Sequence, residues 1–438
     1  MAENLELLFQ GFHKLTREER LERVKQMCHL SDTDLDVLEG KTGLDLDRAE
    51  HFIENLVGYF PIPLGLATYF RIDGRDVPIP MAIEETSVVA ACSSTAKWIR
   101  SFPNGEITTG STGKLIIGQV QFPSVSASAP ILKILEERKE ELLRIANASV
   151  PGLVQRGGGV QSISARSLPR PDGGEMLVLH LYCDPCDAMG ANLINQVCEA
   201  VKPYLENWTG ERVGLCILSN LVDSKLTWAE VKIPGLEPAI GRGIAEASLF
   251  AEMDPYRAAT HNKGVMNGID PVLIATGNDW RAVEAGVHAY CTRSGDYQPV
   301  TKWRFENGTL IGRFEAPIVV GTVGGVTKLH PTAQVCLRIL GTKHADELAR
   351  IIAAVGIVQN LGALRALSTV GIVKGHMSLH ATNLAIAAGA EPLEMPLLRE
   401  KLVAILKKEK AITMSRAKEI LDLIRAKLPL ERPSGDKS

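Results

Sequence analysis

Apolar residues recur at helical spacing near the start of the chain. Thr16 and Glu19 form a capping box, and the apolar positions after them repeat every three residues up to Met27, which predicts a helix. Ser31 is placed to cap a second short helix, and residues 49–57 predict a third that ends at a glycine. We therefore expect the chain to begin with helices.

The pattern then changes to alternation. Residues 70–80 alternate around Asp73-Gly74, a pair that favours the tight turn of a β-hairpin. Ser87 follows at a position suited to cap a helix that runs to about Arg100. A hairpin followed by a helix is thus expected in this segment.

The middle of the chain has the clearest order of elements. Its patterns predict strand, helix, strand, strand, helix and strand over residues 114–122, 131–147, 160–168, 176–183, 188–208 and 213–218. This is the order of the ferredoxin-like split unit, βαββαβ. Its length suits a separate domain.

Together the patterns predict an α+β fold with an insertion. A large mixed α/β domain is expected over residues 1–112 and 220–370, and the ferredoxin-like domain at 113–219 interrupts it. Residues 371–438 have a helical pattern that becomes increasingly charged. Three domains are therefore expected.

The composition is that of an ordinary globular protein. The chain has 438 residues, of which 45% are hydrophobic and 23% charged, with a net charge of -3. This balance argues against a general attraction to nucleic acid, and no apolar stretch is long enough to span a bilayer. The first ten residues carry acids and no basic segment, so they do not resemble a signal peptide.

Eight cysteines are scattered through the chain. That density does not suggest a disulfide framework, so we expect a reducing, cytoplasmic location. Cys183 and Cys186 form a C-x-x-C, but no second pair follows at zinc-finger spacing. Two small buried thiols at a strand end are expected there rather than a metal or redox site.

Five stretches concentrate polar and reactive side chains within apolar sequence, namely residues 83–87, 187–192, 254–268, 275–281 and 375–380. Taken alone, each has a structural explanation. Glu85 and Ser87 suit a helix N-terminus, and Asp279 suits a plain N-cap. His376 and His380 are spaced like a metal pair, but without an H-E-x-x-H motif structural roles are the better expectation.

The 187–192 stretch has a physical case for binding a cofactor. It opens a predicted helix whose free N–H groups suit a phosphate, and Gly190 lets that phosphate approach the backbone. The sequence has no G-x-G-x-x-G after a strand, so the usual Rossmann fingerprint is absent. Any dinucleotide is therefore expected on the βαββαβ unit.

The stretches together resemble the 3-hydroxy-3-methylglutaryl-CoA (HMG-CoA) reductase family, in its soluble bacterial and archaeal class, class II. The resemblance runs from about Gly11 to the C-terminal helices. It is carried by residues 54–58, 74–77, 84–87, 187–192, 256–267, 276–282, 321–331 and 376–381. The membrane-anchored class is not expected, because the hydrophobic N-terminal region is missing.

The resemblance implies a reaction and an architecture. HMG-CoA would be reduced in two steps, through enzyme-held mevaldehyde, to mevalonate and CoA with two NAD(P)H, or mevalonate would be oxidised in reverse. No metal is implied. The large domain would bind CoA and substrate and form a homodimer, possibly assembled further, with the active site at the subunit interface. The small domain would bind NAD(P)H, and residues 371–438 would form a mobile flap.

Catalytic roles follow from the same resemblance. Lys263 would meet the negative charge that builds on the carbonyl oxygen, and Asp279 would orient and keep it charged. Glu85 would act as a general acid near that oxygen. His376 would protonate the departing CoA thiolate, supported by His380 one turn later.

Binding residues are implied as well. Arg257 would pair with the substrate carboxylate, and Ser87 and Asn267 match further substrate contacts. The positions that match the surroundings of the dinucleotide are Asp187, Met189, Gly190, Asn192 and Asn220.

One position departs from the NADH-preferring members. They carry an aspartate before the glycine turn, where this chain has Val150. A carboxylate there would accept the ribose 2′-hydroxyl and repel a 2′-phosphate. Because that repulsion is absent and Arg156 is near, we expect NADPH to be favoured, with dual use open.

Two other functions fit parts of the chain. A CoA-thioester hydrolase or lyase could use the same Lys, Glu and His, but it would leave the 187–192 stretch unexplained. A binding module built on the ferredoxin-like domain, for example for RNA, conflicts with the acidic balance and with the lack of aromatic RNA-binding motifs.

Overall fold

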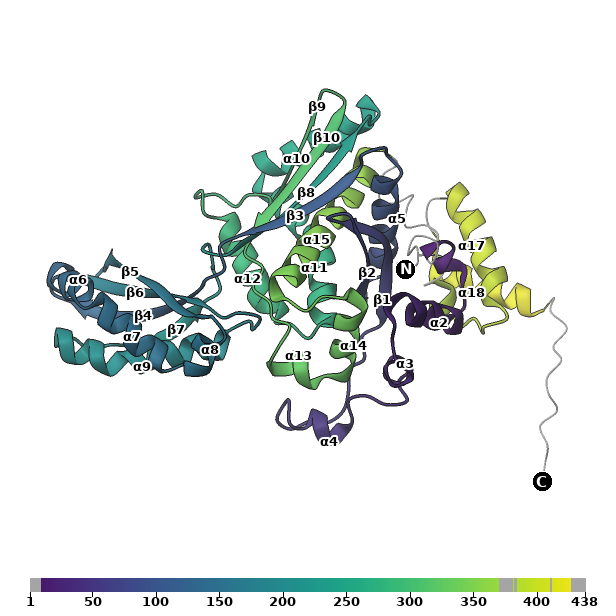
Figure 1. Ribbon diagram of the computed structural model, residues 1–438. Helices are drawn as coiled ribbons and strands as arrows, with labels where there is room; N and C mark the ends of the chain where they lie inside the picture. Colours follow the sequence, from purple (N-terminus) through teal and green to yellow (C-terminus); the bar gives the residue numbers. More distant parts are fainter. Residues whose placement is uncertain (1–8, 370–380, 382–383, 410–411, 427–438) are drawn as a thin grey trace. The chain divides into compact units, whose positions relative to one another are not determined.

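The computed structural model describes residues 9–369, 381, 384–409 and 412–426 (Figure 1). The chain forms two compact units. The first comprises residues 1–84 and 88–362, and the second comprises residues 85–87 and 363–438. Both β-sheets of the described residues lie in the first unit.

The larger sheet has six strands in the order β2-β1-β3-β8-β10-β9. They are β1 (Leu64–Ile72), β2 (Arg75–Ala82), β3 (Glu106–Thr112), β8 (Leu226–Pro234), β9 (Thr301–Glu306) and β10 (Thr309–Ala316). Neighbouring strands are antiparallel except for β1 and β3. The predicted hairpin is confirmed, because Asp73 and Gly74 join β1 to β2 with positive φ values of 50° and 78°, as a tight hairpin turn requires.

The smaller sheet has four antiparallel strands in the order β5-β6-β4-β7. They are β4 (Ile116–Val125), β5 (Gly159–Pro169), β6 (Glu175–Asp184) and β7 (Cys216–Ser219). Helices α7 (Lys139–Ala148) and α9 (Ala191–Thr209) pack on this sheet beside α6 (Ser128–Glu137) and α8 (Pro151–Gln155) (Figure 1). The first and third strands of the unit are central neighbours, as in the expected βαββαβ arrangement.

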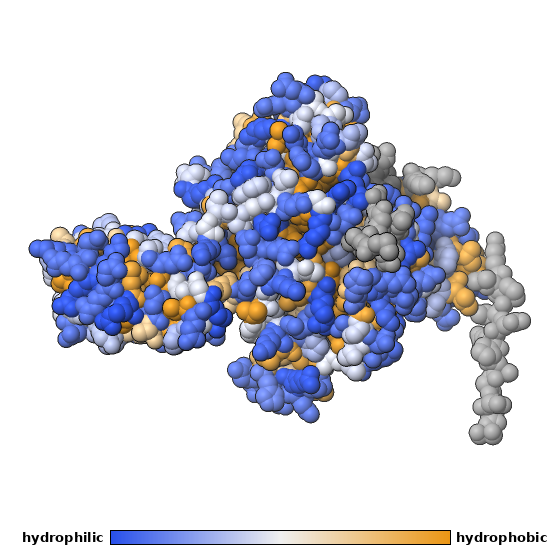
Figure 2. All heavy atoms as spheres, viewed as in Figure 1, coloured by the Kyte–Doolittle hydropathy of each residue, from blue (hydrophilic) through white to orange (hydrophobic). Residues whose placement is uncertain are grey.

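This smaller part has its own core. Leu142, Leu179, Val197 and Val201 are fully buried between its helices and its sheet. Its visible face is mostly polar (Figure 2), as expected when the apolar residues point inward. It leaves the larger sheet after β3 and returns at β8, which pair side by side, so the insertion leaves that sheet continuous.

Helices pack on the larger sheet. The contacts join α5 to β1, α11 and α14 to β2, and α10 to β9. The helices of this part are η1 (Phe12–Lys14), α2 (Arg17–Cys28), α3 (Asp32–Glu39), α4 (Leu46–Ala49), α5 (Val88–Arg100), α10 (Pro238–Met253), α11 (Pro255–Ala275), α12 (Trp280–Cys291), α13 (Gly325–Leu329), α14 (Pro331–Leu340) and α15 (Ala345–Ser368). The predicted caps at Thr16 and Ser31 are confirmed as capping boxes.

Three local predictions are wrong. No helix covers residues 49–57, because α4 ends at Ala49 and, among the described residues that follow, the apolar side chains of Ile53 and Val57 are 55% and 103% exposed, so they add little burial to support a helix. The single helix expected at 131–147 is two helices that meet at Arg138, a residue outside helical geometry. Cys186 is partly exposed, whereas Cys183 is buried as expected; both thiols are free.

The second unit contains α17 (Met395–Glu409) and α18 (Met414–Arg425). Their apolar sides share a small core that includes Leu398, Leu402 and Leu421. Arg425 Nε lies 2.7 Å from Glu394 Oε1 and ties the end of α18 to the segment before α17. The core shows that this part of the chain packs on itself.

One helix in the described part of the chain, α15, is long and apolar enough to cross a membrane. Its most apolar window is 67% buried, as in the core helix of a globular protein, so it is weak evidence for a span. The expected boundaries at residues 112, 219 and 370 stay predictions.

Candidate functional site

Helix α11 carries three of the predicted site residues. Its N-cap is Asp254, which accepts a hydrogen bond from the Tyr256 N–H at 3.1 Å. Lys263 is exposed on this helix, whereas Arg257 and Asn267 are half-buried. Burial lowers the pKa of the Arg257 guanidinium, which remains charged at neutral pH.

A buried polar network holds α11 in place. His261 Nε2 lies 2.5 Å from Thr301 Oγ1, and both Thr301 Oγ1 and Trp303 Nε1 donate to Asn360 Oδ1, at 2.9 and 2.7 Å. Burial and the neighbouring Arg257 charge lower the pKa of His261 to about 4, so its ring is neutral at pH 7. The helix is thereby tied to β9 and α15.

Asp279 is the N-cap of α12. Its Oδ1 accepts from the Ala282 N–H at 3.2 Å and from Arg281 Nε at 3.3 Å. The structural explanation for this residue is therefore correct. Capping restricts the carboxylate to one orientation, which a catalytic role would also need. Helices α11 and α12 pack against each other, so Lys263 and Asp279 lie on neighbouring helices.

The 187–192 stretch forms the loop before α9 and the start of that helix. Gly190 is the N-cap with φ of 91°, and an added Cβ would lie 2.5 Å from Ile116 Cδ1. Glycine is therefore required here for conformation and space. No side chain caps α9, whose first N–H groups suit a phosphate. Met189 is half-buried, and Asn192 is exposed.

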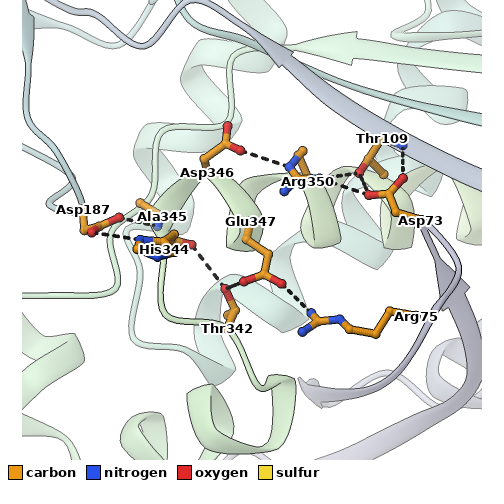
Figure 3. A network of polar contacts seen from close by, with 10 residues as sticks. All are labelled: Asp73, Arg75, Thr109, Asp187, Thr342, His344, Ala345, Asp346, Glu347 and Arg350. Atoms are coloured by element: carbon orange, nitrogen blue, oxygen red, sulfur yellow. Dashed lines mark hydrogen bonds and ion pairs between the residues drawn. The ribbon is translucent and has the colours of Figure 1, made fainter.

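Both oxygens of the Asp187 carboxylate contact the start of α15 (Figure 3). Oδ1 accepts from the Ala345 N–H at 2.9 Å, and Oδ2 lies 3.3 Å from His344 Nδ1. The Asp187 carbonyl also accepts from the Thr322 N–H at 2.9 Å. The loop of the smaller sheet is thus attached to the part of the chain around the larger one.

The same loop is connected to the neighbourhood of Asp279. Gly321 lies so close to the loop that an added Cβ would be 2.6 Å from the Met189 nitrogen. The Gly321 N–H donates to Asn278 Oδ1 at 2.8 Å, and Asn278 precedes Asp279. Gly321 thus connects the predicted cofactor loop to the residue that precedes Asp279.

A cavity of about 430 Å³ lies beside Asp187. It is lined by Lys114, Asp184, Cys186, Asp187, Lys225, His344, Asp346, Glu347 and Arg350. Lys225 is only 4% exposed, and burial lowers its pKa, while the charges of Asp346, Asp184 and Asp187 oppose that change. The acidic side chains that act on Lys225 therefore come both from the segment after β6, in the smaller sheet, and from α15.

The positions expected near the adenosine ribose differ in exposure. Val150 is 7% exposed and belongs to the core of the smaller part, whereas Arg156 is exposed. Asn147 accepts from the Val160 N–H at 2.8 Å, which joins the end of α7 to the residue that follows the glycine turn. Asn220 is exposed after β7.

The remaining predicted residues belong to the second unit or lie outside the described residues. Glu85 is exposed and Ser87 is half-buried with φ of 80°, and both belong to the second unit. His376 and His380 lie outside the described residues. Within the described ranges, no group of three or more His, Cys, Asp or Glu side chains is placed to hold a metal.

Sequence reasoning missed several residues around the loop. Asn278 was inside a polar stretch, but nothing distinguished it from a turn residue. Lys225 stands alone before the apolar strand β8, and a lone lysine usually indicates a solvated position. Ala345 contributes only its backbone N–H, so no residue type could have identified it.

A model of the family described as hydroxymethylglutaryl-coenzyme A reductase matches residues 16–381. The chain is 46% identical over 422 residues to the 3-hydroxy-3-methylglutaryl-coenzyme A reductase of Archaeoglobus fulgidus, covering 95% of this chain and 94% of that protein.

Two solved structures of the Streptococcus pneumoniae enzyme are similar at 37% identity. One has a TM-score of 0.80 and covers 95% of this chain and 100% of the other. The second, a class II reductase bound to NADPH in open conformations, has a TM-score of 0.79 and covers 82% and 100%. The expected resemblance and fold class are confirmed, and the chain belongs to the hydroxymethylglutaryl-coenzyme A reductase family.

Proposed function

We propose that this protein reduces HMG-CoA to mevalonate and CoA with two equivalents of NADPH or NADH. The carrying observation is the connection from the 187–192 loop through Gly321 to Asn278 beside Asp279. It supports a nicotinamide cofactor lying next to the end of α11 and the start of α12. The bound dihydronicotinamide supplies the hydride.

The protein's own residues stabilise charge and move protons. Lys263 presents an ammonium group to the carbonyl oxygen as negative charge develops, and the capped Asp279 carboxylate orients it. Arg257 binds the substrate carboxylate with its planar guanidinium, and Asn267 lies on the same helix for a further contact. Glu85 and Ser87 join them, Glu85 as a general acid.

His376 protonates the CoA thiolate when the first reduction product collapses to mevaldehyde. A thiol of this kind ionises near ~8.5, so an imidazolium is a suitable acid at neutral pH. We infer that residues 371–438 act as the flap that carries this histidine. The protein works as a cytoplasmic homodimer whose active site lies between subunits, and no metal takes part.

On the cofactor side, the fit to a dinucleotide rests on three features. The start of α9 has no side-chain cap, Gly190 has the positive φ that turns the loop into α9, and Asp187 lies beside a cavity. NADPH is favoured, because Val150 brings no carboxylate and Arg156 is exposed nearby. A Val150→Asp exchange would bury a charge in the core, so Arg156→Ala is the cleaner test.

The experiment is the HMG-CoA-dependent oxidation of NADPH and NADH, with mevalonate measured as product. We expect two equivalents of cofactor consumed for each mevalonate formed. Arg156→Ala should raise the KM for NADPH about tenfold and leave that for NADH unchanged, since a phosphate contact is worth about one charge-assisted hydrogen bond. Absence of cofactor oxidation with HMG-CoA would refute the proposed reaction.

A further inference from the structure

The start of α15 holds the Asp187 carboxylate from another part of the chain. A long helix leaves its first N–H groups without partners inside the helix, and an acid placed there is favoured by the helix dipole. Such a cap usually comes from the residue just before the helix. Here Asp187, 158 residues away from Ala345 in the sequence, supplies it.

Both oxygens of the Asp187 carboxylate are contacted, so its orientation is fixed as well as its distance from α15. The Ala345 N–H binds Oδ1 at 2.9 Å, while His344 Nδ1 lies 3.3 Å from Oδ2 (Figure 3). The backbone of the loop is held separately, by the Thr322 N–H on the Asp187 carbonyl. Side chain and backbone are therefore both restrained.

The start of α15 is itself anchored on the larger sheet (Figure 3). Arg350 contacts Asp346 within the helix and Asp73 in the β1–β2 turn, both at 3.0 Å. Glu347 Oε1 lies 2.7 Å from Arg75 Nη2 in the following strand. These pairs join the first two turns of α15 to the hairpin, so several ion pairs hold the element that carries the donors to Asp187.

Positive charge in the adjoining cavity also helps to hold the loop before α9. Lys225, almost completely buried, faces acids at both ends of the Asp184–Asp187 segment as well as Asp346. Lys114 Nζ lies 2.5 Å from Asp184 Oδ2, and the same carboxylate accepts from the Cys186 N–H at 2.9 Å. The loop before α9 is thus held at its beginning and at Asp187.

We propose that Ala345, through its backbone N–H, and His344 are positioning residues for cofactor binding. They hold Asp187, and with it the 187–192 loop, in the conformation that receives NADPH. This inference rests on the proposed function, in which that loop binds the cofactor. Neither residue needs to touch the cofactor; both act through Asp187.

The test removes a single N–H. Ala345 is the first residue of α15, where proline is tolerated because that N–H takes no part in the helix. Ala345→Pro therefore deletes the donor to Asp187, and Ala345→Gly keeps it as the matched comparison. We expect the Kd for NADPH, measured by its fluorescence, to be about tenfold higher for Ala345→Pro than for Ala345→Gly, equivalent to about 1.4 kcal/mol.

The kinetic readout separates positioning from general damage. The KM for NADPH should rise in parallel with its Kd, while kcat at saturating NADPH and the KM for HMG-CoA stay within about twofold. If Ala345→Pro does not fold, His344→Ala is compared with Lys343→Ala instead. We then expect the Kd for NADPH to be about threefold higher for His344→Ala. Equal NADPH affinities within each pair would overturn the inference.

Asp187→Ala distinguishes the positioning role of Ala345 and His344 from the cofactor role of the loop. If this variant weakens NADPH binding but Ala345→Pro and His344→Ala do not, the positioning role is wrong and the cofactor role of the loop stands. If Asp187→Ala itself binds NADPH as tightly as the wild-type protein, the cofactor role assigned to Asp187 is wrong. Weaker NADPH binding in all three variants supports both the positioning role and the cofactor role.

Discussion

Two polar networks of the first unit end on the same helix, α15, and differ in their exposure. The one around Asn360 is buried, with His261 and Asn360 each 1% exposed. The one around Asp187 is open to solvent, with side-chain exposures of 37% for Asp187 and 73% for His344. The first joins α11 to α15, and the second joins the loop before α9 to the start of α15.

Because of this difference in exposure, we expect one network to stabilise the fold and the other to position the cofactor loop. A buried donor that loses its acceptor cannot turn to water, so the buried network contributes strongly to the free energy of folding. An exposed carboxylate that loses a partner is resolvated at little cost. We therefore expect changes around Asn360 to unfold the protein and changes around Asp187 to alter its cofactor binding.

The largest expected effect on stability comes from Asn360→Leu. It would leave the Trp303 indole N–H and the Thr301 hydroxyl buried without their acceptor. We expect the free energy of unfolding in urea to fall by about 3 kcal/mol, since each unsatisfied buried group costs about 1–3 kcal/mol. A loss below about 1 kcal/mol would show that the buried network does not support the fold as described.

The next effect depends on pH and concerns His261. The pKa of His261 is lowered to about 4 in the folded protein, against about 6.5 when unfolded, so between pH 6.5 and 4 the unfolded chain takes up the proton in preference to the folded one. Stability should therefore decrease as the pH falls from 6.5 to 4, by up to about 3 kcal/mol.

His261→Asn checks this contribution. The stability difference between the wild-type protein and the variant should shrink between pH 7 and pH 4.5 in urea unfolding. Carboxylates that titrate in the same range affect both proteins and cancel in that difference. A difference that stays constant with pH would mean that the folded imidazole ionises normally.

The smallest expected effect is that of Arg350→Met in the exposed network. The side chain pairs with Asp73 and Asp346 near the surface, where such pairs contribute about 1 kcal/mol or less. The midpoint of thermal unfolding should shift by no more than a few degrees. A loss as large as that of Asn360→Leu would remove the distinction between the two networks.

The sequence predicted what depends on local pattern. The βαββαβ order, the hairpin at Asp73-Gly74 and the caps at Thr16, Ser31 and Asp279 follow from neighbouring residues and turn chemistry. The helix expected at 49–57 is wrong because an apolar pattern needs a surface to pack against, and Ile53 and Val57 are exposed in the described part of the first unit.

Contacts between segments that are distant in the sequence could not be predicted from local sequence patterns. Strand β3 pairs with β8 across the whole insertion, and Thr112 faces Leu226 in that pairing. The hydrogen bond that holds Asp187 comes from a backbone N–H, which every residue except proline carries. The site residues themselves were found by resemblance to a family, because their spacing alone also fits ordinary caps and turns.

The central claim is that Lys263 stabilises the charge that builds on the carbonyl oxygen of the substrate. Its most direct test compares Lys263→Ala with Lys302→Ala, which removes an exposed lysine from β9. We expect Lys263→Ala to lower the kcat of HMG-CoA-dependent NADPH oxidation by about a hundred- to a thousandfold, with NADPH affinity and unfolding free energy unchanged. A kcat within about threefold of that of Lys302→Ala would contradict the claim.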